Sequence, residues 1–306
     1  MALTTSGTLP GPVGAYYEKR FLMRAEKNFV LDQLGTQGRV PKGEGKTVVW
    51  NRITNPTAKT TALTEGTDPT PTGLSATLVS ATLSQYGNYE QVTDYLELTA
   101  VDTLIKEVMD TLAYEAALTI DTTIRDELVD SATGTVQYAS GVAARNSLVS
   151  TDIVQVADIR KAKRQLNRFS AKPHTKDRFV GVAHPDVIYD LEGDTNWVNA
   201  HLYTEIGIDG IFNGEAGELY GTRWIMYDNA TVLTNSGSAG TEVYVSWIMG
   251  KDFFGVSKLQ NLETYVDSPS PRSALRLYSD IGWKASYAVK SLNDSFAIRL
   301  ESGATA

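Results

Sequence analysis

The feature that most constrains the fold of this chain is a contrast between two neighbouring stretches. Residues 54–73 contain three prolines and one large apolar residue, Leu63. Loops of this length are uncommon in compact domains unless they are functional or mobile. From about residue 99 to 131, apolar residues recur at three- and four-residue spacing without Gly or Pro, which predicts one helix of about 50 Å. A flexible projection next to a rigid helix is a suitable arrangement for a subunit that reaches across its neighbours. It is a poor arrangement for forming the pocket of an enzyme.

Strand-like stretches flank the Pro-rich loop on both sides. Residues 46–53 are rich in β-branched and aromatic side chains, and residues 74–95 resume the same character. Together they predict an extended hairpin with the loop at its tip. A lone hairpin is marginally stable in water, and its long unpaired edges favour aggregation. Both problems disappear if a neighbouring subunit receives the hairpin.

Composition and charge exclude several classes of protein. The chain has no cysteine, so disulfides and cysteine-ligated metals are excluded, and folding in a reducing cytoplasm is the natural inference. No apolar run is long enough for a transmembrane helix, and the N-terminus lacks the pattern of a secretory signal. The 28 basic and 36 acidic residues give a net charge of −8. This balance disfavours chain-wide attraction to nucleic acid, but an acidic shell can enclose a polyanion.

The rest of the chain predicts a mixed α/β arrangement, from apolar periodicity and from the positions of Gly and Pro. The expected elements are a flexible arm (1–14), helices (16–34, 152–169 and 186–191), strands (178–183, 222–227 and 242–249), a glycine-rich loop (207–221), a turn (235–240) and two final strands joined near Asn293 (281–300).

Histidines and carboxylates gather between residues 174 and 201. Such groups can bind a metal, and a metal-dependent hydrolase would use His184, Asp186 and Asp190. However, no HExxH motif is present, and the segment mixes helix, turn and loop. The ordinary interpretation is helix capping and surface charge. The side chains of this group are His174, His184, Asp186, Asp190, Glu192, Asp194 and His201.

Basic residues cluster in and after the helix expected at 152–169. A basic patch can contact nucleic acid, can be the solvated face of an amphipathic helix, or can meet acidic side chains of a neighbouring subunit. The overall acidity of the chain disfavours phosphate binding. No Walker loop, GxGxxG loop or GxSxG nucleophile motif is present. The cluster comprises Arg160, Lys161, Lys163, Arg164, Arg168, Lys172, Lys176 and Arg178.

Five stretches of sequence carry a resemblance to a known family. They are LSQYGNYEQVTDYLEL (83–98), VAHPDVIYDLEGDTNW (182–197), GELYGTRWIMYDNA (217–230), WIMGKDFFGV (247–256) and IGWKASYAVKSLND (281–294). Jointly they resemble the tailed-bacteriophage major capsid proteins grouped with the major coat protein of phage N-four. The order of arm, extended loop, long helix and α/β region resembles the HK-97-like fold over nearly the whole chain.

The resemblance implies an α+β capsid fold with an extended β-hairpin loop, a long spine helix, and peripheral and axial domains. It divides the chain into an N-terminal arm (1–41), the extended loop (42–95), a peripheral domain with the spine helix (96–150), an axial domain (151–270) and return strands to the peripheral domain (271–306). Some family members cross-link a lysine to an asparagine. Lys59 lies in the loop, but no acceptor or catalytic glutamate can be assigned, so no cross-link is predicted.

The implied function is that of a major capsid protein, not an enzyme and without cofactor or metal. Copies would assemble into pentamers and hexamers of an icosahedral shell around double-stranded DNA, which the shell would enclose without sequence-specific binding. Scaffold, portal and decoration proteins would be further partners, and no membrane is involved. Assembly would take place in the host bacterial cytoplasm, and the mature location would be the virion capsid.

Candidate contacts between subunits come from the loop, its flanking strands and the basic helix. They are Trp50, Lys59, Leu63, Glu65, Tyr86, Tyr89, Arg160, Arg164 and Arg168. Two alternatives stay open at this point. One is the metal-dependent hydrolase, and the other is a capsid-decorating or adhesin module, which would form trimers or fibres instead of closed shells.

Overall fold

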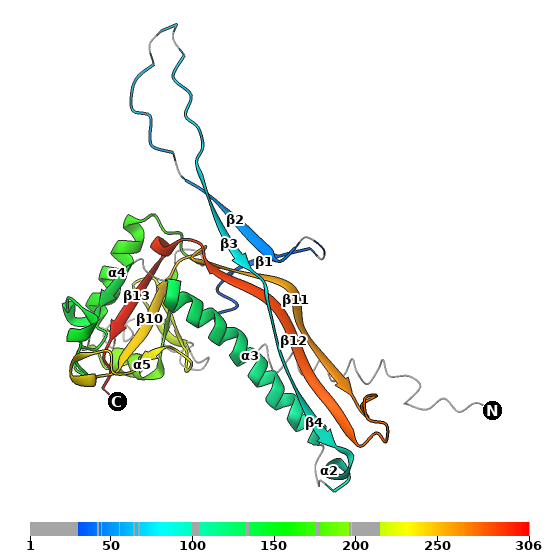
Figure 1. Ribbon diagram of the computed structural model, residues 1–306. Coiled ribbons are helices and arrows are strands. Elements are labelled where there is room, and N and C mark those ends of the chain that lie inside the picture. Colours follow the sequence, from blue (N-terminus) through cyan, green and yellow to red (C-terminus); the bar gives the residue numbers. More distant parts are fainter. Residues whose placement is uncertain are drawn as a thin grey trace.

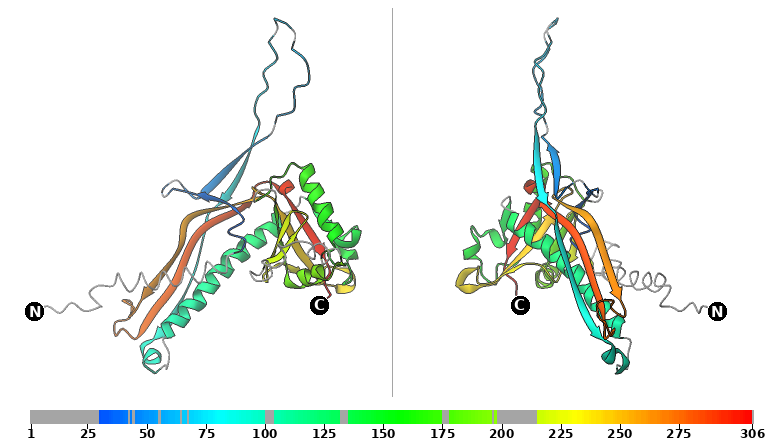
Figure 2. Two further views of the ribbon diagram at one scale, coloured as in Figure 1. Left: turned by 180° about the vertical axis from the view of Figure 1, so that it is seen from behind. Right: turned by 45° about the vertical axis from the view of Figure 1, so that its right-hand side comes forward.

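The computed structural model describes residues 30–305, except for positions 42, 44, 55, 64, 67, 100–103, 132–134, 175–177, 196 and 198–214. The described chain forms two bodies and a projection (Figure 1). One body is a long sheet with a helix laid along it, and the other is a second sheet with helices on it. The tip of a β-hairpin projects away from both bodies in every view (Figure 2). No helix in this described part has the length and apolarity to cross a membrane.

The long sheet has four strands in the order β1-β11-β12-β4. Its strands are β1 (Thr36–Arg39), β4 (Ser84–Thr93), β11 (Phe254–Asp267) and β12 (Tyr278–Ser291). β1 is parallel to β11, whereas β12 is antiparallel to both of its neighbours. Helix α3 (Leu104–Ser131) packs against β12. Its buried stripe includes Met109, Leu112, Ala116, Ile120, Ile124 and Leu128.

The long helix predicted from the sequence is confirmed for the 28 residues of α3, a length of about 42 Å. Its predicted start is wrong. Thr99 is the last residue of a separate short helix, α2 (Asp94–Thr99). The Asp94 carboxylate accepts a hydrogen bond from the Tyr95 backbone N–H at 2.7 Å, so this helix begins where strand character was still expected. Residues 100–103 lie outside the described residues.

The second sheet has seven strands, in the order β5-β13-β10-β6-β8-β7 with β9 beside β10. They are β5 (Val136–Tyr138), β6 (Phe179–Ala183), β7 (Glu215–Leu219), β8 (Thr222–Met226), β9 (Val232–Leu233), β10 (Val243–Met249) and β13 (Ala297–Ser302). Helices α4 (Val156–Arg168) and α5 (Pro185–Glu192) pack against this sheet. Short 3₁₀ turns complete the described chain: η2 (Ala139–Gly141), η3 (Arg145–Ser147), η4 (Ser238–Gly240) and η5 (Asp294–Phe296).

The two faces of the second sheet belong to different cores. Ile159 of α4 and Ile188 of α5 share one core with Ile248 of β10. On the other face, Trp247 of β10 shares a core with Leu128 near the end of α3. The central strands are therefore buried on both sides, which explains their continuous apolar sequences. The spine helix joins the two bodies through this second core.

The predicted hairpin is confirmed as β2 (Thr47–Ile53) paired antiparallel with β3 (Ala76–Thr82), with Trp50 opposite Val79. Its tip, residues 54–75, has no regular secondary structure in the part that is described. A hydrogen bond from the Thr54 backbone N–H to the Ser75 carbonyl at 2.9 Å closes its base. The strand character expected up to residue 95 extends beyond the hairpin, because β4 pairs with β12 in the long sheet.

The sheet pairings divide the chain differently from the five predicted segments. β4 follows the hairpin but lies in the long sheet, as does β11, which falls in the segment expected to be axial. The two final strands separate: β12 joins the long sheet and β13 joins the second sheet. The order of the strands along the chain does not reveal these pairings, because the strands of a sheet need not be neighbours in sequence.

Three local predictions also differ from the structure. The predicted loop at 207–221 contains β7 in its described part. The helix predicted at 16–34 lies mostly outside the described residues, and residues 30–35 form turns. β11 was not predicted as a strand, because irregular pairing near Gln260 interrupts the period of two that reveals strands.

A buried ionic cluster fixes the C-terminal strand. Glu301 of β13 is fully buried and forms a bidentate pair with Arg145, at 2.7 Å to Nε and 2.6 Å to Nη2. Arg299 Nε lies 2.7 Å from Glu301 Oε1, and Arg299 Nη1 donates to the Val129 carbonyl of α3 at 3.0 Å. The hydrogen bonds that Arg145 donates to Glu301 raise the pKa of Arg145, whereas burial lowers the pKa of Arg299. One carboxylate therefore ties together β13, the η3 turn and the end of α3.

A buried carboxylate of α3 holds the turn at residues 30–35. Asp121 Oδ2 accepts a hydrogen bond from the Val30 backbone N–H at 2.9 Å. Beside it, Asp32 forms an ion pair with Lys258 of β11 at 2.7 Å. Burial raises the pKa of Asp121 to about 6, and the backbone N–H groups of the turn oppose that rise. The carboxylate is thus costly to ionise in the folded chain.

Replacing Asp121 with asparagine is expected to remove a pH dependence of stability. Because the folded state holds a proton on Asp121 that the unfolded chain has released, stability falls as pH rises from the ordinary pKa of 3.8 to about 6. The Asp121→Asn variant keeps an oxygen acceptor for Val30 but has no charge to bury. Its unfolding free energy relative to wild type should rise by about 3 kcal/mol between roughly pH 4 and pH 7. Denaturant unfolding of dissociated subunits at several pH values measures this, and a pH-independent difference would contradict it.

Candidate interaction surfaces

The histidines and carboxylates that were considered as an alternative metal site have structural contacts in the described chain. His184 caps α5, with its Nδ1 accepting the Asp186 backbone N–H at 3.2 Å. Asp190 accepts hydrogen bonds from the backbone N–H and hydroxyl of Thr305. His174 Nε2 lies 3.2 Å from the Leu34 carbonyl oxygen. Within the described residues, no three potential ligands are grouped for a metal. His201 lies outside the described residues.

The base of the hairpin packs on its own subunit through one face. Val48 is buried with Leu83 and Ala288 of β12. The Trp50 indole lies against Gly255 of β11, where a Cβ atom would come within 3.0 Å of the ring. Gly255 therefore makes room for Trp50. Trp50 anchors the hairpin within the subunit, and its predicted contact with another subunit stays a prediction.

The opposite face of the hairpin carries exposed apolar side chains. Residues opposite one another in antiparallel strands share a face, so Val49, Ile53 and Leu78 lie on the same side. Their exposed fractions are 55%, 59% and 68%. Trp50 was predicted as a contact from the sequence, whereas these three residues were missed. Their alternation with Val48 and Trp50 was visible, but alternation does not say which set of side chains is covered.

The predicted contact residues at the tip lie far from either core. Leu63 is 74% exposed, and Lys59 and Glu65 are also exposed. The tip rises beyond the paired strands, away from the rest of the described chain (Figure 1). These three residues are therefore presented to the surroundings.

The two predicted tyrosines of β4 differ in their surroundings. Tyr86 is partly buried and stacks on Tyr287 of β12, with ring centroids 4.8 Å apart. Tyr89 is exposed and lines an open groove of about 580 Å³ with Tyr265 and Lys284. The Lys284 ammonium lies 4.8 Å from the centre of the Tyr265 ring. Of the two, only Tyr89 offers most of its ring to a partner.

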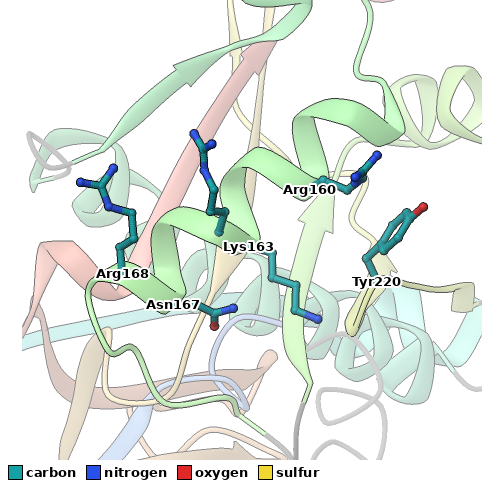
Figure 3. A pocket seen from close by; sticks show the side chains of 6 residues that line it. Arg160, Lys163, Asn167, Arg168 and Tyr220 are labelled. Carbon is teal, nitrogen blue, oxygen red and sulfur yellow. The ribbon is translucent and has the colours of Figure 1, made fainter.

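The three predicted arginines of α4 come together on one outer face. This basic face, defined as Arg160, Lys163, Arg164 and Arg168, lines an open pocket of about 510 Å³ with Asn167 and Tyr220 (Figure 3). The apolar side chains of α4 point the other way, into the core. The predicted solvated face of an amphipathic helix is confirmed, and Tyr220 is a member of the surface that was not predicted from the sequence.

A second exposed apolar patch lies at the far end of the long sheet. Tyr95 and Leu98 of α2 and Leu275 of the β11–β12 connection are all exposed. The Leu277 carbonyl accepts a hydrogen bond from the Asp94 backbone N–H at 2.9 Å, which joins the two segments. This patch was not predicted, because its members come from distant parts of the sequence.

A family model matches most of this chain, and solved structures share its fold. Residues 76–299 match the family model described as phage capsid protein. No curated protein matches the chain significantly. Among solved structures, the capsid of Ralstonia phage GP4 is similar with a TM-score of 0.70 at 15% identity, over 90% of this chain and 91% of that one.

Two further capsids show the same fold. The cyanophage P-SCSP1u capsid has a TM-score of 0.70 at 13% identity, covering 90% of this chain and 89% of that one. The capsid of Helicobacter pylori bacteriophage KHP30 has a TM-score of 0.65 at 15% identity, covering 87% of both chains. These similarities confirm the predicted HK-97-like α+β fold. The family match indicates a structural role and a place in the virion capsid. The chain therefore belongs to the phage capsid protein family and is a major capsid protein.

Proposed function

We propose that copies of this chain assemble into hexamers and pentamers of an icosahedral shell around double-stranded DNA, with the β2–β3 hairpin as the main link between neighbours. The observation that carries this proposal is the two-sided hairpin. One side is fixed to its own sheet through Val48 and Trp50. The other side exposes the apolar side chains of Val49, Ile53 and Leu78.

The proposed mechanism is a physical link between subunits and involves no chemical reaction. A neighbouring subunit that covers the exposed face of the hairpin would bury its apolar side chains and satisfy its strand edges. The tip, with Lys59, Leu63 and Glu65, would adapt to slightly different positions in hexamers and pentamers, because it has few internal contacts to break. Tyr89 is proposed as a secondary contact between subunits.

The domain assignment follows the same proposal. The four-stranded sheet with α3 would be the peripheral domain, and the seven-stranded sheet with α4 and α5 would be the axial domain around the symmetry centres. On this assignment β4 and β11 belong to the peripheral domain and β13 to the axial domain, in keeping with their pairing. The role is structural and not enzymatic. Assembly would take place in the host cytoplasm with scaffold, portal and decoration proteins as additional partners.

Three serine substitutions on the exposed face of the hairpin test the proposal. The variant Val49→Ser, Ile53→Ser, Leu78→Ser should fold as wild type, because exposed positions contribute within about 0.5 kcal/mol each. It should lose about 3 kcal/mol or more at each contact between subunits, which corresponds to a weakening of about 100-fold. Light scattering after size-exclusion chromatography measures the mass of the particles, and negative-stain electron microscopy shows their shape.

A conservative variant of the same positions is the matched control. Val49→Ile, Ile53→Val, Leu78→Ile keeps the face apolar and should form shells. Shells from the triple-serine variant would contradict the role of the hairpin. Trimers or fibres from the wild type would favour a decorating or adhesin module. Stoichiometric metal together with activity lost in His184→Ala would favour a hydrolase.

A further inference from the structure

The basic face of α4 is not neutralised by the described part of the chain. Two nearby cations have carboxylate partners: Lys161 with Asp158 at 3.1 Å, and Arg178 with Glu218 at 3.0 Å. No described carboxylate makes an ion pair with Arg160, Lys163, Arg164 or Arg168. The chain as a whole carries 36 acidic and 28 basic residues. These four cations therefore create a positive electrostatic potential at this face, although the net charge of the protein is negative.

The geometry of the face suits an extended anion. Positions 160, 163, 164 and 168 follow helical spacing and span about 12 Å along the axis. Together with Asn167 and Tyr220 they line the open pocket, with Arg160 beside the Tyr220 ring and Arg168 farther along α4 (Figure 3). Three are guanidinium groups, whose planar forks bind phosphate or carboxylate oxygens in pairs. The pocket is open and can admit a chain of charges as well as a single ion.

A turn in the neighbouring hairpin helps to orient this face. Tyr220 and Gly221 connect β7 to β8, with φ of 50° and 71°. This left-handed conformation is unusual for tyrosine, and it places the exposed ring beside α4. The Arg160 guanidinium carbon lies 5.5 Å from the ring centre. A cation over an aromatic face is attracted to it, so Tyr220 holds Arg160 at the rim of the pocket.

The composition of the face favours nucleic acid over a protein partner. Protein–protein interfaces use arginine together with aromatic and other apolar side chains and are depleted in lysine, whereas interfaces with DNA are much more positively charged. The large apolar residues of α4, Ile159 and Leu166, are fully buried. The exposed aromatic rings near this face are Tyr220, which lines the pocket, and Phe169, at the end of the helix. A partner protein would therefore find one aromatic ring, and no aliphatic side chain, among the described residues that line the pocket.

We propose that the basic face of α4 binds the phosphodiester backbone of nucleic acid independently of sequence. Phosphate oxygens would accept hydrogen bonds from the three guanidinium groups, the Lys163 ammonium and the Asn167 amide. The inference deepens the proposed function and rests on it for the presence of DNA. It implies that this face is turned toward the enclosed genome and limits its use as a contact between subunits.

Binding of a double-stranded DNA fragment of arbitrary sequence to the full-length protein tests this inference. Fluorescence anisotropy would be measured between about 50 and 200 mM salt, where each neutralised phosphate contributes about −0.9 to the slope of log K against log salt. The variant Arg160→Gln, Arg164→Gln, Arg168→Gln should bind at least about 10-fold more weakly, and its salt slope should be smaller in magnitude by about three. Arg164→Gln alone should reduce the slope by about one, which provides a measurement if the triple variant is unstable.

A charge-matched variant separates a local site from a net-charge effect. Arg39→Gln, Lys46→Gln, Lys106→Gln removes the same charge from the long sheet, the base of the hairpin and α3, and should retain wild-type DNA affinity. Equal losses in both triple variants, or no DNA binding by wild type at about 50 mM salt, would overturn the inference.

Assembly and DNA binding can be measured separately. Repeating the titration in the triple-serine hairpin variant measures DNA binding without shells, so a failure of assembly and a failure of DNA binding can be told apart. An α4 variant that binds DNA normally but forms no shells would assign the face to an acidic surface of another copy instead.

Discussion

Removal of residues 55–72 should give a subunit that folds normally but does not form closed shells. The deletion joins Thr54 to Gly73 and leaves a four-residue loop between the paired residues Ile53 and Ala76. Loops of four residues are common in hairpins, and the described tip contributes nothing to either core. The unfolding free energy of dissociated subunits should therefore change by less than about 1 kcal/mol. Each subunit loses the segment proposed to reach its neighbour.

Electron microscopy and unfolding measurements distinguish the outcomes of this deletion. A control that replaces residues 55–72 with a Gly/Ser linker of equal length tests whether length or side chains matter. If contacts of Leu63 and its neighbours are needed, the linker variant should also fail to assemble. Normal shells from the shortened chain would show that the tip is dispensable and would contradict its role between subunits.

Replacing Glu301 with glutamine should destabilise the folded subunit by about 3–5 kcal/mol, because it removes one partner from a buried ionic cluster. The substitution leaves Arg145 and Arg299 facing each other without the carboxylate that pairs both. Since the cluster joins β13 to the end of α3, we expect subunits that unfold early and yield few shells. Chemical denaturation of dissociated subunits measures the loss.

A surface ion pair provides the matched control for Glu301. Glu218 pairs with Arg178 at 3.0 Å, and both side chains are partly exposed. Glu218→Gln should cost no more than about 1 kcal/mol, because water screens such pairs. Similar effects of the two substitutions would contradict the structural importance of the buried cluster.

The sequence predicted those elements whose signals are local. The spacing of Leu112, Ala116 and Ile120 identified α3, and the β-branched run ending at Ile53 with the prolines that follow identified the hairpin. His184 followed by proline correctly predicted the start of α5. In each case the pattern of side chains arises from the geometry of one helix, strand or turn.

The sequence could not predict which strands pair with one another or which faces are covered. β12 and β13 are separated by a few residues but lie in different sheets, because their partners β11 and β10 come from elsewhere in the chain. Val48 and Val49 are equally apolar, yet Leu83 and Ala288 cover only the side of Val48. The basic face of α4 was predictable from spacing, but Tyr220 was not, because it reaches α4 through the β7–β8 turn.

The most direct test of the central claim is a cryo-electron microscopy map of particles assembled from the wild-type protein. The proposal predicts hexamers and pentamers in which each β2–β3 hairpin crosses to the adjacent subunit, with Val49, Ile53 and Leu78 covered by that neighbour. Closed shells in which these three side chains remain exposed to solvent in every subunit would contradict it.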